Sequence, residues 1–549
     1  MADFKKSVVY QIYPKSFYDS NGDGLGDLRG VIEKLDYIKE LGVDYIWMTP
    51  FFVSPQKDNG YDVEDYYNID PRYGTMEDVE ELSREAEKRG IRLMFDMVFN
   101  HTSDRNQWFQ KALAGDPKYK DFYIFKKGPK PGVPPTNWES KFGGSAWEYV
   151  EKFDEYYLHL FDVSQPDLNW ENPEVRKEVQ NVIKFWMGKG IKGFRFDVVN
   201  LISKDKYEND YEGDGRRFYT DGPNIHKYLR ELNEATFGTD AEIITVGEMS
   251  STTMENCYQY ANEDGKELSM VFSFHHLKVD FMGNEKWVIV PFDFQKLKYI
   301  LFDWQVNMGK HHAWNAVFWC NHDQPRVVSR FGNVEKYWKE SAKMLGTVIH
   351  CLRGTPYIYQ GEELGMTNAG FTDISQYKDV ESLNHFRILQ EKGLTEENAY
   401  QILQIHSRDN SRTPMQWTSG ENGGFTTGEP WIEVNKNCSY INAEAELQDE
   451  DSIFHYYQKL IALRKKYDVI AYGDLKPLDE KNPSVFAYER EYQGEKMMVI
   501  CNFYGKEVTW DSEMDLGEYQ CVLSNYNEHA IEGTRIELKP YEAVVLYKK

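Results

Sequence analysis

Three carboxylic acids stand at the ends of short apolar segments: Asp197 in GFRFDVVN, Glu248 in TVGEMS and Asp323 in NHDQPR. Basic residues accompany two of them, since Arg195 precedes Asp197 by two positions and His322 directly precedes Asp323. Any single acid could simply cap the helix that follows its strand. Two such acids together suit glycosidic bond cleavage, in which one attacks the anomeric carbon and the other protonates the leaving oxygen. The set therefore predicts glycoside hydrolysis.

These side chains can meet only if the elements that carry them end at the same place. Eight apolar segments alternate with amphipathic helical patterns, and this alternation predicts an α/β fold, a (β/α)8 barrel. The active site of such a barrel forms at the C-terminal ends of its strands, where the three acids stand. The expected strands are residues 8–13, 43–49, 92–98, 193–199, 242–248, 269–274, 315–321 and 355–361.

Helix signals separate these strands. Thr75 with Asp78 forms a capping-box pattern at the start of a helix that Gly90 ends. Another helix is expected to begin at Asn172, with Pro173 in its first turn, and to run to Gly188.

The domain organisation follows from the gaps between these elements. The stretch between the third and fourth strands is too long for one helix and is rich in Pro, Gly and aromatic residues, which predicts an inserted subdomain. The end of the chain alternates as four short strand segments, residues 484–491, 496–504, 519–526 and 543–549, and predicts a small all-β domain. We therefore expect a barrel in two parts (1–100 and 169–477), an inserted subdomain B (101–168) and a C-terminal β-sandwich domain (478–549).

Composition excludes several classes of protein. The 549 residues carry a formal charge of −25, which disfavours nucleic acid and anionic lipid as partners. No run of about 18 apolar residues could span a membrane, and no secretory signal is visible at the start. The six cysteines are scattered without a CxxC pair, so free thiols in a reducing cytoplasm are expected.

The motifs DMVFNH (96–101), QPDLNW (165–170), GFRFDVVN (193–200), GEM (247–249) and NHDQ (321–324) resemble, in order, the signature regions of the α-amylase superfamily of retaining glycoside hydrolases. This resemblance covers essentially the whole chain. It implies that Asp197 is the nucleophile, that Glu248 is the general acid/base and that Asp323 stabilises the oxocarbenium-like transition state.

The same resemblance implies roles for the basic residues. His101 and His322 would hydrogen-bond the sugar in the subsite that is cleaved. Arg195 should pair with Asp197 and keep it ionised. Glu248 must instead hold a proton near neutral pH, which requires a less polar setting or a negative neighbour. The two reacting carboxyl groups should lie roughly 5–5.5 Å apart, the separation of retaining enzymes.

Three further stretches, residues 11–30, 58–62 and 411–417, resemble the oligo-1,6-glucosidase branch of exo-acting α-glucosidases. By that resemblance Asp58 and Arg412 clamp the terminal glucose and Tyr61 stacks on it. The substrate site is then expected to be a closed pocket rather than an open cleft.

A loop near the start of the chain has the oxygen-ligand spacing of an EF-hand, with Gly24 at the sharp turn. The twelfth position is Gly30 rather than Glu, and no helix precedes the loop, so we expect a lone structural Ca²⁺ or Mg²⁺ as this family branch often has. The alternative is a loop of Asx turns without an ion. No organic cofactor is implied. The expected metal ligands are Asp19, Asn21, Asp23, the carbonyl oxygen of Leu25, and Asp27.

Five stretches are more similar to trehalose-6-phosphate hydrolases than to oligo-1,6-glucosidases: residues 135–148, 212–224, 247–253, 272–281 and 291–298. Residues 274–298 also carry a net charge of +1 in this acidic chain, and such a local reversal could hold a phosphate. Lys278 and Lys296 are the preferred ligands, and Lys286 is a weaker one because a Lys-Trp pair also occurs in the branch without phosphate. Each lysine taken singly could equally be ordinary solvated surface.

The sequence thus predicts hydrolysis of a phosphorylated disaccharide, trehalose 6-phosphate, to glucose and glucose 6-phosphate through a covalent glucosyl-Asp197 intermediate. One alternative is an oligo-1,6-glucosidase that acts on isomaltose-type oligosaccharides. Another is a non-catalytic transporter subunit with an amylase-like barrel. Such subunits have a transmembrane helix and have lost catalytic acids, whereas this chain keeps Asp197, Glu248 and Asp323.

Overall fold

A closed barrel of eight parallel strands forms the centre of the molecule, in the order β1-β13-β12-β11-β10-β9-β5-β2. The computed structural model describes residues 3–549. All eight segments predicted from the sequence are strands of this barrel, so the (β/α)8 fold is confirmed. The strands are β1 (Val9–Ile12), β2 (Tyr45–Met48), β5 (Arg92–Met97), β9 (Gly193–Phe196), β10 (Ile244–Glu248), β11 (Met270–Phe272), β12 (Asn315–Val317) and β13 (Thr355–Tyr359).

The barrel strands are apolar because helices cover the outside of the sheet and side chains fill the inside. Polar residues in the strands are therefore exceptions, and the strand register brings two of them together. Asp96 of β5 lies directly opposite Arg195 of β9. This register places a buried acid beside the arginine that precedes Asp197.

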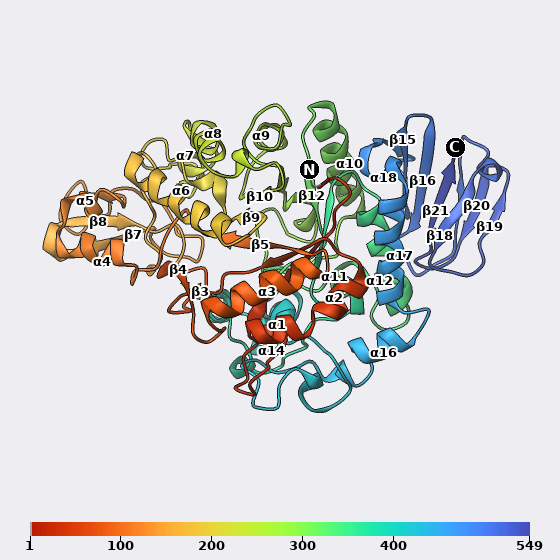
Figure 1. Cartoon of the computed structure of the whole chain (residues 1–549), viewed down its shortest axis with the longest axis horizontal. Coiled ribbons are helices and arrows are strands. Elements are labelled where there is room, and N and C mark those ends of the chain that lie inside the picture. The colour runs from red at the N-terminus through yellow and green to blue at the C-terminus, as the bar shows by residue number, and fades with distance from the viewer. Residues whose placement is uncertain (1–2) are drawn as a thin grey trace.

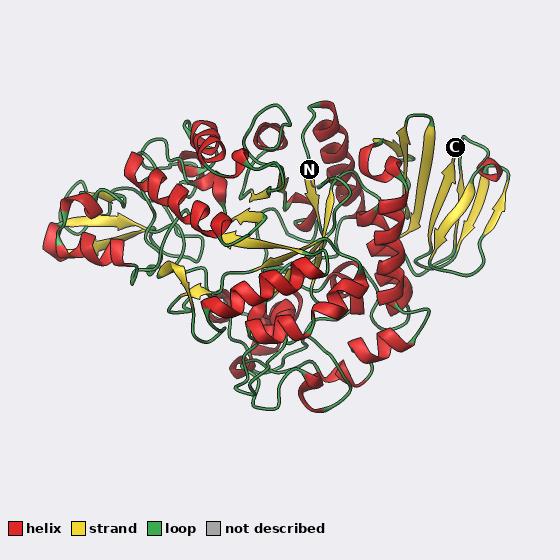
Figure 2. Ribbon diagram, viewed as in Figure 1, coloured by secondary structure: helices red, strands yellow, loops and turns green. Residues whose placement is uncertain are grey.

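Helices surround the barrel (Figure 2). The capping box predicted at Thr75 and Asp78 is present at the start of α3 (Met76–Lys88), and the side chain of Asn172 caps α6 (Pro173–Gly188). Both helix predictions are thus confirmed. The other long helices are α8 (Ile225–Ala235), α10 (Phe294–Lys310), α12 (Trp338–His350), α13 (Val380–Glu391), α14 (Glu396–His406) and α17 (Ile453–Lys466). Within residues 3–549 we find no helix that is both long and apolar enough to cross a membrane.

The segment between β5 and β9 forms a small subdomain that projects from the barrel (Figure 1). It contains α4 (Gln107–Ala114), α5 (Pro117–Lys120) and a three-stranded antiparallel sheet in the order β6-β8-β7. These strands are β6 (Phe125–Lys126), β7 (Trp147–Val150) and β8 (Glu155–Leu158). The insertion expected from the sequence is therefore present as a folded unit.

The C-terminal strands lie at the opposite end of the long axis of the molecule (Figure 1). They form a five-stranded sheet, β14-β15-β16-β21-β18, and a three-stranded sheet, β17-β20-β19, which share one apolar core. The four strand segments predicted there are confirmed as β15, β16, β18 and β21. The sequence missed β14, β17, β19 and β20. The bounds are β14 (Asp474–Leu478), β15 (Val485–Tyr492), β16 (Glu495–Asn502), β17 (Val508–Asp511), β18 (Gln520–Ser524), β19 (Ala530–Glu532), β20 (Arg535–Leu538) and β21 (Ala543–Lys548).

A long segment between β13 and α17 follows the last barrel strand, and no helix or strand was predicted in it from the sequence. Between β13 and α17 the chain forms α13, α14 and the short helix α15 (Asp409–Arg412). This segment returns to the C-terminal end of the barrel, where it places Arg408 and Arg412 in the candidate site.

Candidate active site

The three predicted acids lie at the C-terminal end of the barrel. Asp197 directly follows β9, Glu248 is the last residue of β10, and Asp323 lies in the loop after β12. Because the parallel strands all end at this face, side chains that are far apart in the sequence meet there. The spacing that suggested catalysis therefore corresponds to a single site in space.

Arg195 joins two of the acids. Its Nη1 donates hydrogen bonds to Oδ1 of Asp197 and to Oδ1 of Asp96, each at 2.7 Å, and its Nη2 pairs with Glu248. The guanidinium is buried, and it lies 5.1 Å from the ring centre of Trp47. One cation thus faces three carboxyl groups. A single positive charge cannot compensate three negative charges in a buried site, so at least one carboxyl group should retain a proton near neutral pH.

The pKa of Asp197 reflects this crowding. Burial raises it from its ordinary value to about 7, the negative charges of Asp96 and Asp323 act in the same direction, and Arg195 opposes them. The pairing of Arg195 with Asp197 that the sequence predicted is present. The charge of Arg195 alone does not offset the effect of burial on the pKa of Asp197. Asp197 is therefore fully ionised only when the proton that the three carboxyl groups retain is on Asp96 or Glu248.

Asp323 is held in the opposite state. Its Oδ1 accepts a hydrogen bond from Nη2 of Arg412 at 2.6 Å and lies 3.4 Å from Nη1 of Arg408. Burial disfavours the charged form, but the permanent positive charges of Arg408 and Arg412 oppose it, and the pKa of Asp323 lies below its usual range. Asp323 is therefore a permanent negative charge at the site.

His322 is positioned as a neutral hydrogen-bond donor. Gln11 donates to its Nδ1 at 2.8 Å, so the ring proton belongs on Nε2, which makes no hydrogen bond within residues 3–549 and lies 3.4 Å from Oδ2 of Asp323. Its ring stacks on that of Tyr61, with centres 5.2 Å apart. Burial lowers the pKa of His322 to about 3, which keeps the imidazole uncharged. An unoccupied N–H in a buried site is what a sugar hydroxyl requires.

The other predicted sugar ligands surround the same space. His101 Nε2 lies 3.2 Å from the carbonyl oxygen of Tyr61, and burial lowers the pKa of His101 to about 4. The hydroxyl of Tyr61 donates to Asp96 at 2.9 Å. Asp58 accepts a hydrogen bond from Gln165 at 3.1 Å, and burial raises its pKa to about 7. The site thus contains both neutral and charged groups.

Sequence reasoning missed two members of this site, Arg408 and Asp379. Arg408 Nη2 binds Asp379 at 2.6 Å and lies 3.8 Å from Asp58, so it connects the pocket acid with Asp323. No periodicity or motif marked either residue. The only available signal was the position of Arg408 three residues before the SRTPMQW motif.

The three lysines proposed for phosphate binding have different surroundings. Lys278 is partly buried and Lys296 is exposed, and neither forms an ion pair within residues 3–549. Lys286 instead pairs with Glu381 at 2.9 Å and lies 4.6 Å from the ring centre of Trp287. Glu381 also lies 3.4 Å from Arg408, so the amine of Lys286 belongs to an ionic chain that leads towards Asp323.

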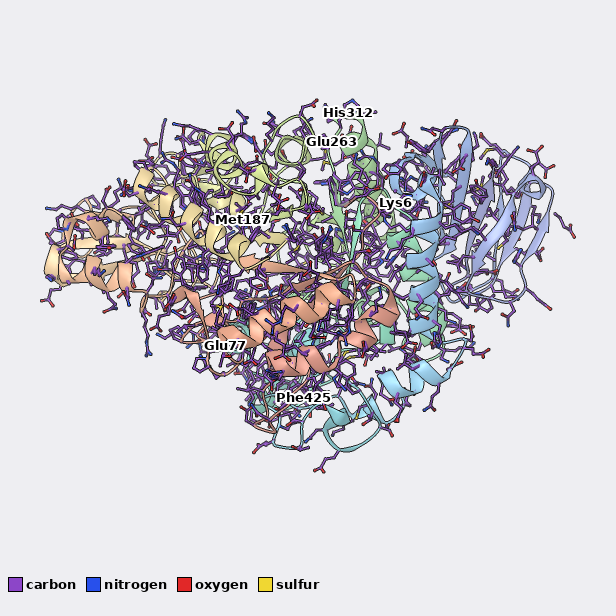
Figure 3. All side chains as sticks on the ribbon, in the orientation of Figure 1. Lys6, Glu77, Met187, Glu263, His312 and Phe425 are labelled. Carbon is purple, nitrogen blue, oxygen red and sulfur yellow. The ribbon has the colours of Figure 1, made fainter. Side chains whose placement is uncertain are left out.

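The loop proposed for a metal ion is organised by its own backbone. Asp19 accepts hydrogen bonds from the N–H groups of Asn21, Gly22 and Gly24, and Asp27 caps α1 (Leu28–Glu33). The backbone N–H of Asp19 donates to the carbonyl oxygen of Phe425, which is labelled on a neighbouring loop in Figure 3. Across residues 3–549 we find no group of three or more His, Cys, Asp or Glu side chains that could hold a metal ion. These Asx turns fit the alternative without an ion, and the metal stays a prediction.

Chelation tests that prediction. If the loop binds Ca²⁺ or Mg²⁺, excess chelator should lower the melting temperature by about 2–5 °C through loss of a ligand that binds only the folded chain. Turnover of the surviving enzyme should barely change, because the loop precedes every catalytic strand end. The replacement Asp23→Ala, at an exposed ligand position, should abolish the response to chelator. Identical melting with and without chelator would show that the loop holds no ion.

Comparisons with known proteins agree with the geometry of the site. The family described as α-amylase catalytic domain matches residues 11–473, and the α-amylase SusG C-terminal domain matches residues 485–545. The trehalose-6-phosphate hydrolase of Bacillus subtilis is 57% identical over 99% of this chain and 97% of its own. That of Escherichia coli is 53% identical over 98% of both. An oligo-1,6-glucosidase of Bacillus cereus is 50% identical over 100% of this chain and 99% of its own.

A comparison with solved structures gives a further trehalose-6-phosphate hydrolase. The crystal structure of the Bacillus licheniformis trehalose-6-phosphate hydrolase superposes with a TM-score of 0.96 at 56% sequence identity and covers 100% of both chains.

Proposed function

We propose that this chain, which belongs to the α-amylase family of glycoside hydrolases, hydrolyses trehalose 6-phosphate to glucose and glucose 6-phosphate. The observation that carries the proposal is the meeting of Asp197 and Glu248 on the guanidinium of Arg195 at the end of the barrel. The identity of 57% with a trehalose-6-phosphate hydrolase along nearly the whole chain supports the choice of substrate.

In the first step Asp197 attacks the anomeric carbon of the unphosphorylated glucose. Glu248 gives its proton to the glycosidic oxygen, so glucose 6-phosphate leaves and a covalent glucosyl-Asp197 remains. In the second step Glu248 takes a proton from water, which attacks the same carbon and releases glucose. Two inversions leave the configuration of the anomeric carbon retained.

The charges around Arg195 fit this division of roles. When the one proton that the cluster retains is on Glu248, Arg195 faces only the two negative charges of Asp96 and Asp197. Asp197 is then free to be the ionised nucleophile, and Glu248 is ready to act as the acid. The three carboxyl groups around Arg195 therefore set the protonation states of both Asp197 and Glu248.

Asp323 stabilises the transition state through its negative charge. Positive charge develops on the ring oxygen and anomeric carbon as the glycosidic bond breaks. Because Arg408 and Arg412 keep Asp323 ionised, its negative charge is in place before that positive charge develops. A preorganised charge of this kind needs no reorganisation during the reaction.

The unphosphorylated glucose is expected to occupy the space lined by Asp58, Tyr61, His101, His322 and Arg412. Buried Asp58 and Arg412 would hold hydroxyl groups at the closed end of the pocket. The free Nε2–H of His322 gives a donor that the apo site leaves unused.

The 6-phosphate lies on the leaving sugar in this scheme, and Lys278 and Lys296 were proposed for it from the sequence. Their lack of carboxylate partners supports that role, whereas the pairing of Lys286 with Glu381 weighs against a direct contact by Lys286. All six cysteines are free thiols, which supports the expected location in the reducing cytoplasm.

Release of glucose from three substrates tests the function. Trehalose 6-phosphate, trehalose and isomaltose are supplied separately at equal concentration, and initial rates are measured. We expect kcat/KM on trehalose 6-phosphate to exceed that on trehalose by about a hundredfold, the worth of charged hydrogen bonds to a phosphate. Faster hydrolysis of isomaltose than of trehalose 6-phosphate would instead establish an oligo-1,6-glucosidase.

A further inference from the structure

A cluster of cations lies beside the segment that follows Glu248. Lys141, from the inserted subdomain, places its Nζ 3.1 Å from the hydroxyl oxygen of Ser250 and 5.6 Å from the ring centre of Tyr219. Lys141 forms no ion pair within residues 3–549. A partly buried ammonium group whose one hydrogen-bond partner is a neutral hydroxyl is unusual, since buried charges are normally paired.

Two more cations belong to this cluster. Arg216 begins α7 (Arg216–Tyr219), and its side chain binds one carboxylate within residues 3–549, that of Asp214, at 2.8 Å. Lys278, at the end of a short turn after β11, has no carboxylate partner among the described residues. Lys141 lies over the ring of Tyr219, the last residue of the helix that Arg216 begins. Lys278 directly follows the turn His275–Leu277, and His275 lies against the backbone of Thr252, two residues after Ser250. Burial and the charge of Arg216 lower the pKa of both Lys141 and Lys278, in agreement with this placement.

Ser250 is held rigidly at the catalytic centre. Its backbone N–H donates to Oδ1 of Asn200 at 2.9 Å, and Nδ2 of Asn200 donates to its carbonyl oxygen at 2.8 Å. Ser250 follows Glu248 by two residues, and Asn200 follows Asp197 by three. Through its contact with Ser250, Lys141 therefore connects the cation cluster to the segments that carry Asp197 and Glu248.

The cluster lies on the side of the leaving sugar. Because Glu248 protonates the leaving oxygen in the proposed function, we place the leaving sugar beside the segment directly after Glu248. Phe142, the neighbour of Lys141, lies 5.4 Å from the guanidinium of Arg408 and so covers the pocket side. Residues 141–142 thus span from the glucose pocket to the leaving-sugar side.

Three clustered cations with one carboxylate among them repel one another in the free enzyme. Burial, with Arg216 adding to it, lowers the pKa of Lys141 to about 7, as expected of an ammonium group removed from water without a paired carboxylate. A sugar phosphate, with a second pKa of about 6, brings nearly two negative charges at pH 7 and would pair with all three.

We propose that Lys141, Arg216 and Lys278 together bind the 6-phosphate of the leaving sugar and that Lys141 is the residue that sets the preference for the phosphorylated disaccharide. This inference rests on the proposed function and adds the recognition site to it. It assigns the phosphate to three separate segments: the inserted subdomain, the short helix α7 and the turn after β11.

The test replaces each cation and compares two substrates. Lys141→Met, Arg216→Gln and Lys278→Ala should each lower kcat/KM on trehalose 6-phosphate by about 10- to 100-fold. Nitrophenyl glucoside lacks the phosphate, so its hydrolysis should stay within about threefold and also shows that each variant is folded. Lys141→Arg should recover most of the activity, because it restores the charge.

Arg217 provides a matched control. It neighbours Arg216 on the same helix but pairs with Asp210 at 2.9 Å and Glu212 at 3.0 Å. Arg217→Gln removes the same charge from the chain and should leave the ratio of the two substrates unchanged. A loss equal to that of Arg216→Gln would mean that overall charge, not a defined site, attracts the phosphate.

The dependence of activity on pH tests the role of Lys141 independently, because a purely structural role would leave this dependence unchanged. The ratio of kcat/KM on trehalose 6-phosphate to kcat/KM on nitrophenyl glucoside should fall as pH rises through about 7, because free Lys141 loses its proton there. Lys141→Met should lack this fall. Asp197 acts on both substrates, so its titration cancels in the ratio. Glu248 and the substrate phosphate titrate alike in the wild type and in Lys141→Met, so the reading is the part of the fall that the wild type shows and the variant lacks.

Failure of this inference differs from failure of the proposed function. If the wild-type enzyme does not prefer trehalose 6-phosphate to trehalose, the proposed function is wrong. If the wild type has that preference and Lys141→Met keeps it, the recognition site is wrong and the function stands. Equal losses on both substrates would assign Lys141 to the support of Ser250 and Glu248, which also overturns the inference.

Discussion

Asp197→Asn should reduce kcat on every α-glucoside by about a thousandfold or more, because an amide cannot attack the anomeric carbon. The loss should be the same for trehalose 6-phosphate and nitrophenyl glucoside, since the bond to Asp197 forms with both. Initial rates with the two substrates measure it. Asp205→Asn is a suitable control: this aspartate is exposed eight residues further along the chain and should behave as wild type.

The fold should survive this replacement. Asp197 is one of three carboxyl groups around Arg195, so a neutral amide relieves repulsion between Asp197 and Asp96 and still accepts a hydrogen bond from Nη1. The melting temperature should therefore be unchanged or higher. A variant that keeps more than about a tenth of the wild-type rate would remove Asp197 from the role of nucleophile, and one that melts much lower would show that its charge holds the barrel end together.

The barrel could be predicted from sequence because its strands are buried on both faces. Such strands read as short apolar runs, and all eight were found with their ends within a few residues. The reacting acids could be predicted for the same reason, since a polar residue that closes an apolar run stands out. Asp197, Glu248 and Asp323 all belong to this class.

The rest of the site could not be predicted in the same way because its positions depend on tertiary structure. Arg408 and Asp379 come from the segment between β13 and α17, where no strand end marks them. Lys286 seemed free in a basic window, but its partner Glu381 lies 95 residues away. Lys141 was in a stretch noted only for its similarity to relatives, and only the folded chain brings it to Ser250.

The missed strands of the C-terminal domain have a similar explanation. β14, β17, β19 and β20 are three to five residues long, and in each of them exposed positions interrupt the half-buried or buried ones. The four strands that were found are longer or more continuously apolar, as β15 and β16 are. Short, half-exposed strands depend on their neighbours more than on their own sequence.

Glu248→Gln should separate the two chemical steps, because its effect depends on the leaving group. Trehalose 6-phosphate releases a sugar alkoxide, which cannot depart without a proton, so its kcat/KM should fall by about 10²- to 10⁴-fold. Nitrophenolate is a much more stable anion and leaves without that help. Formation of the glucosyl-Asp197 intermediate from nitrophenyl glucoside should therefore remain comparatively fast.

Hydrolysis of that intermediate should then become rate-limiting, since Gln cannot take the proton from the attacking water. We expect a burst of nitrophenol equal to the enzyme concentration, followed by a slow steady state with a lowered KM. A small anionic nucleophile such as azide needs no base and should restore turnover of nitrophenyl glucoside but not of trehalose 6-phosphate. Equal losses on both substrates, with no burst and no response to azide, would mean that Glu248 is not the acid/base, and its contact with Arg195 would then be a purely structural one.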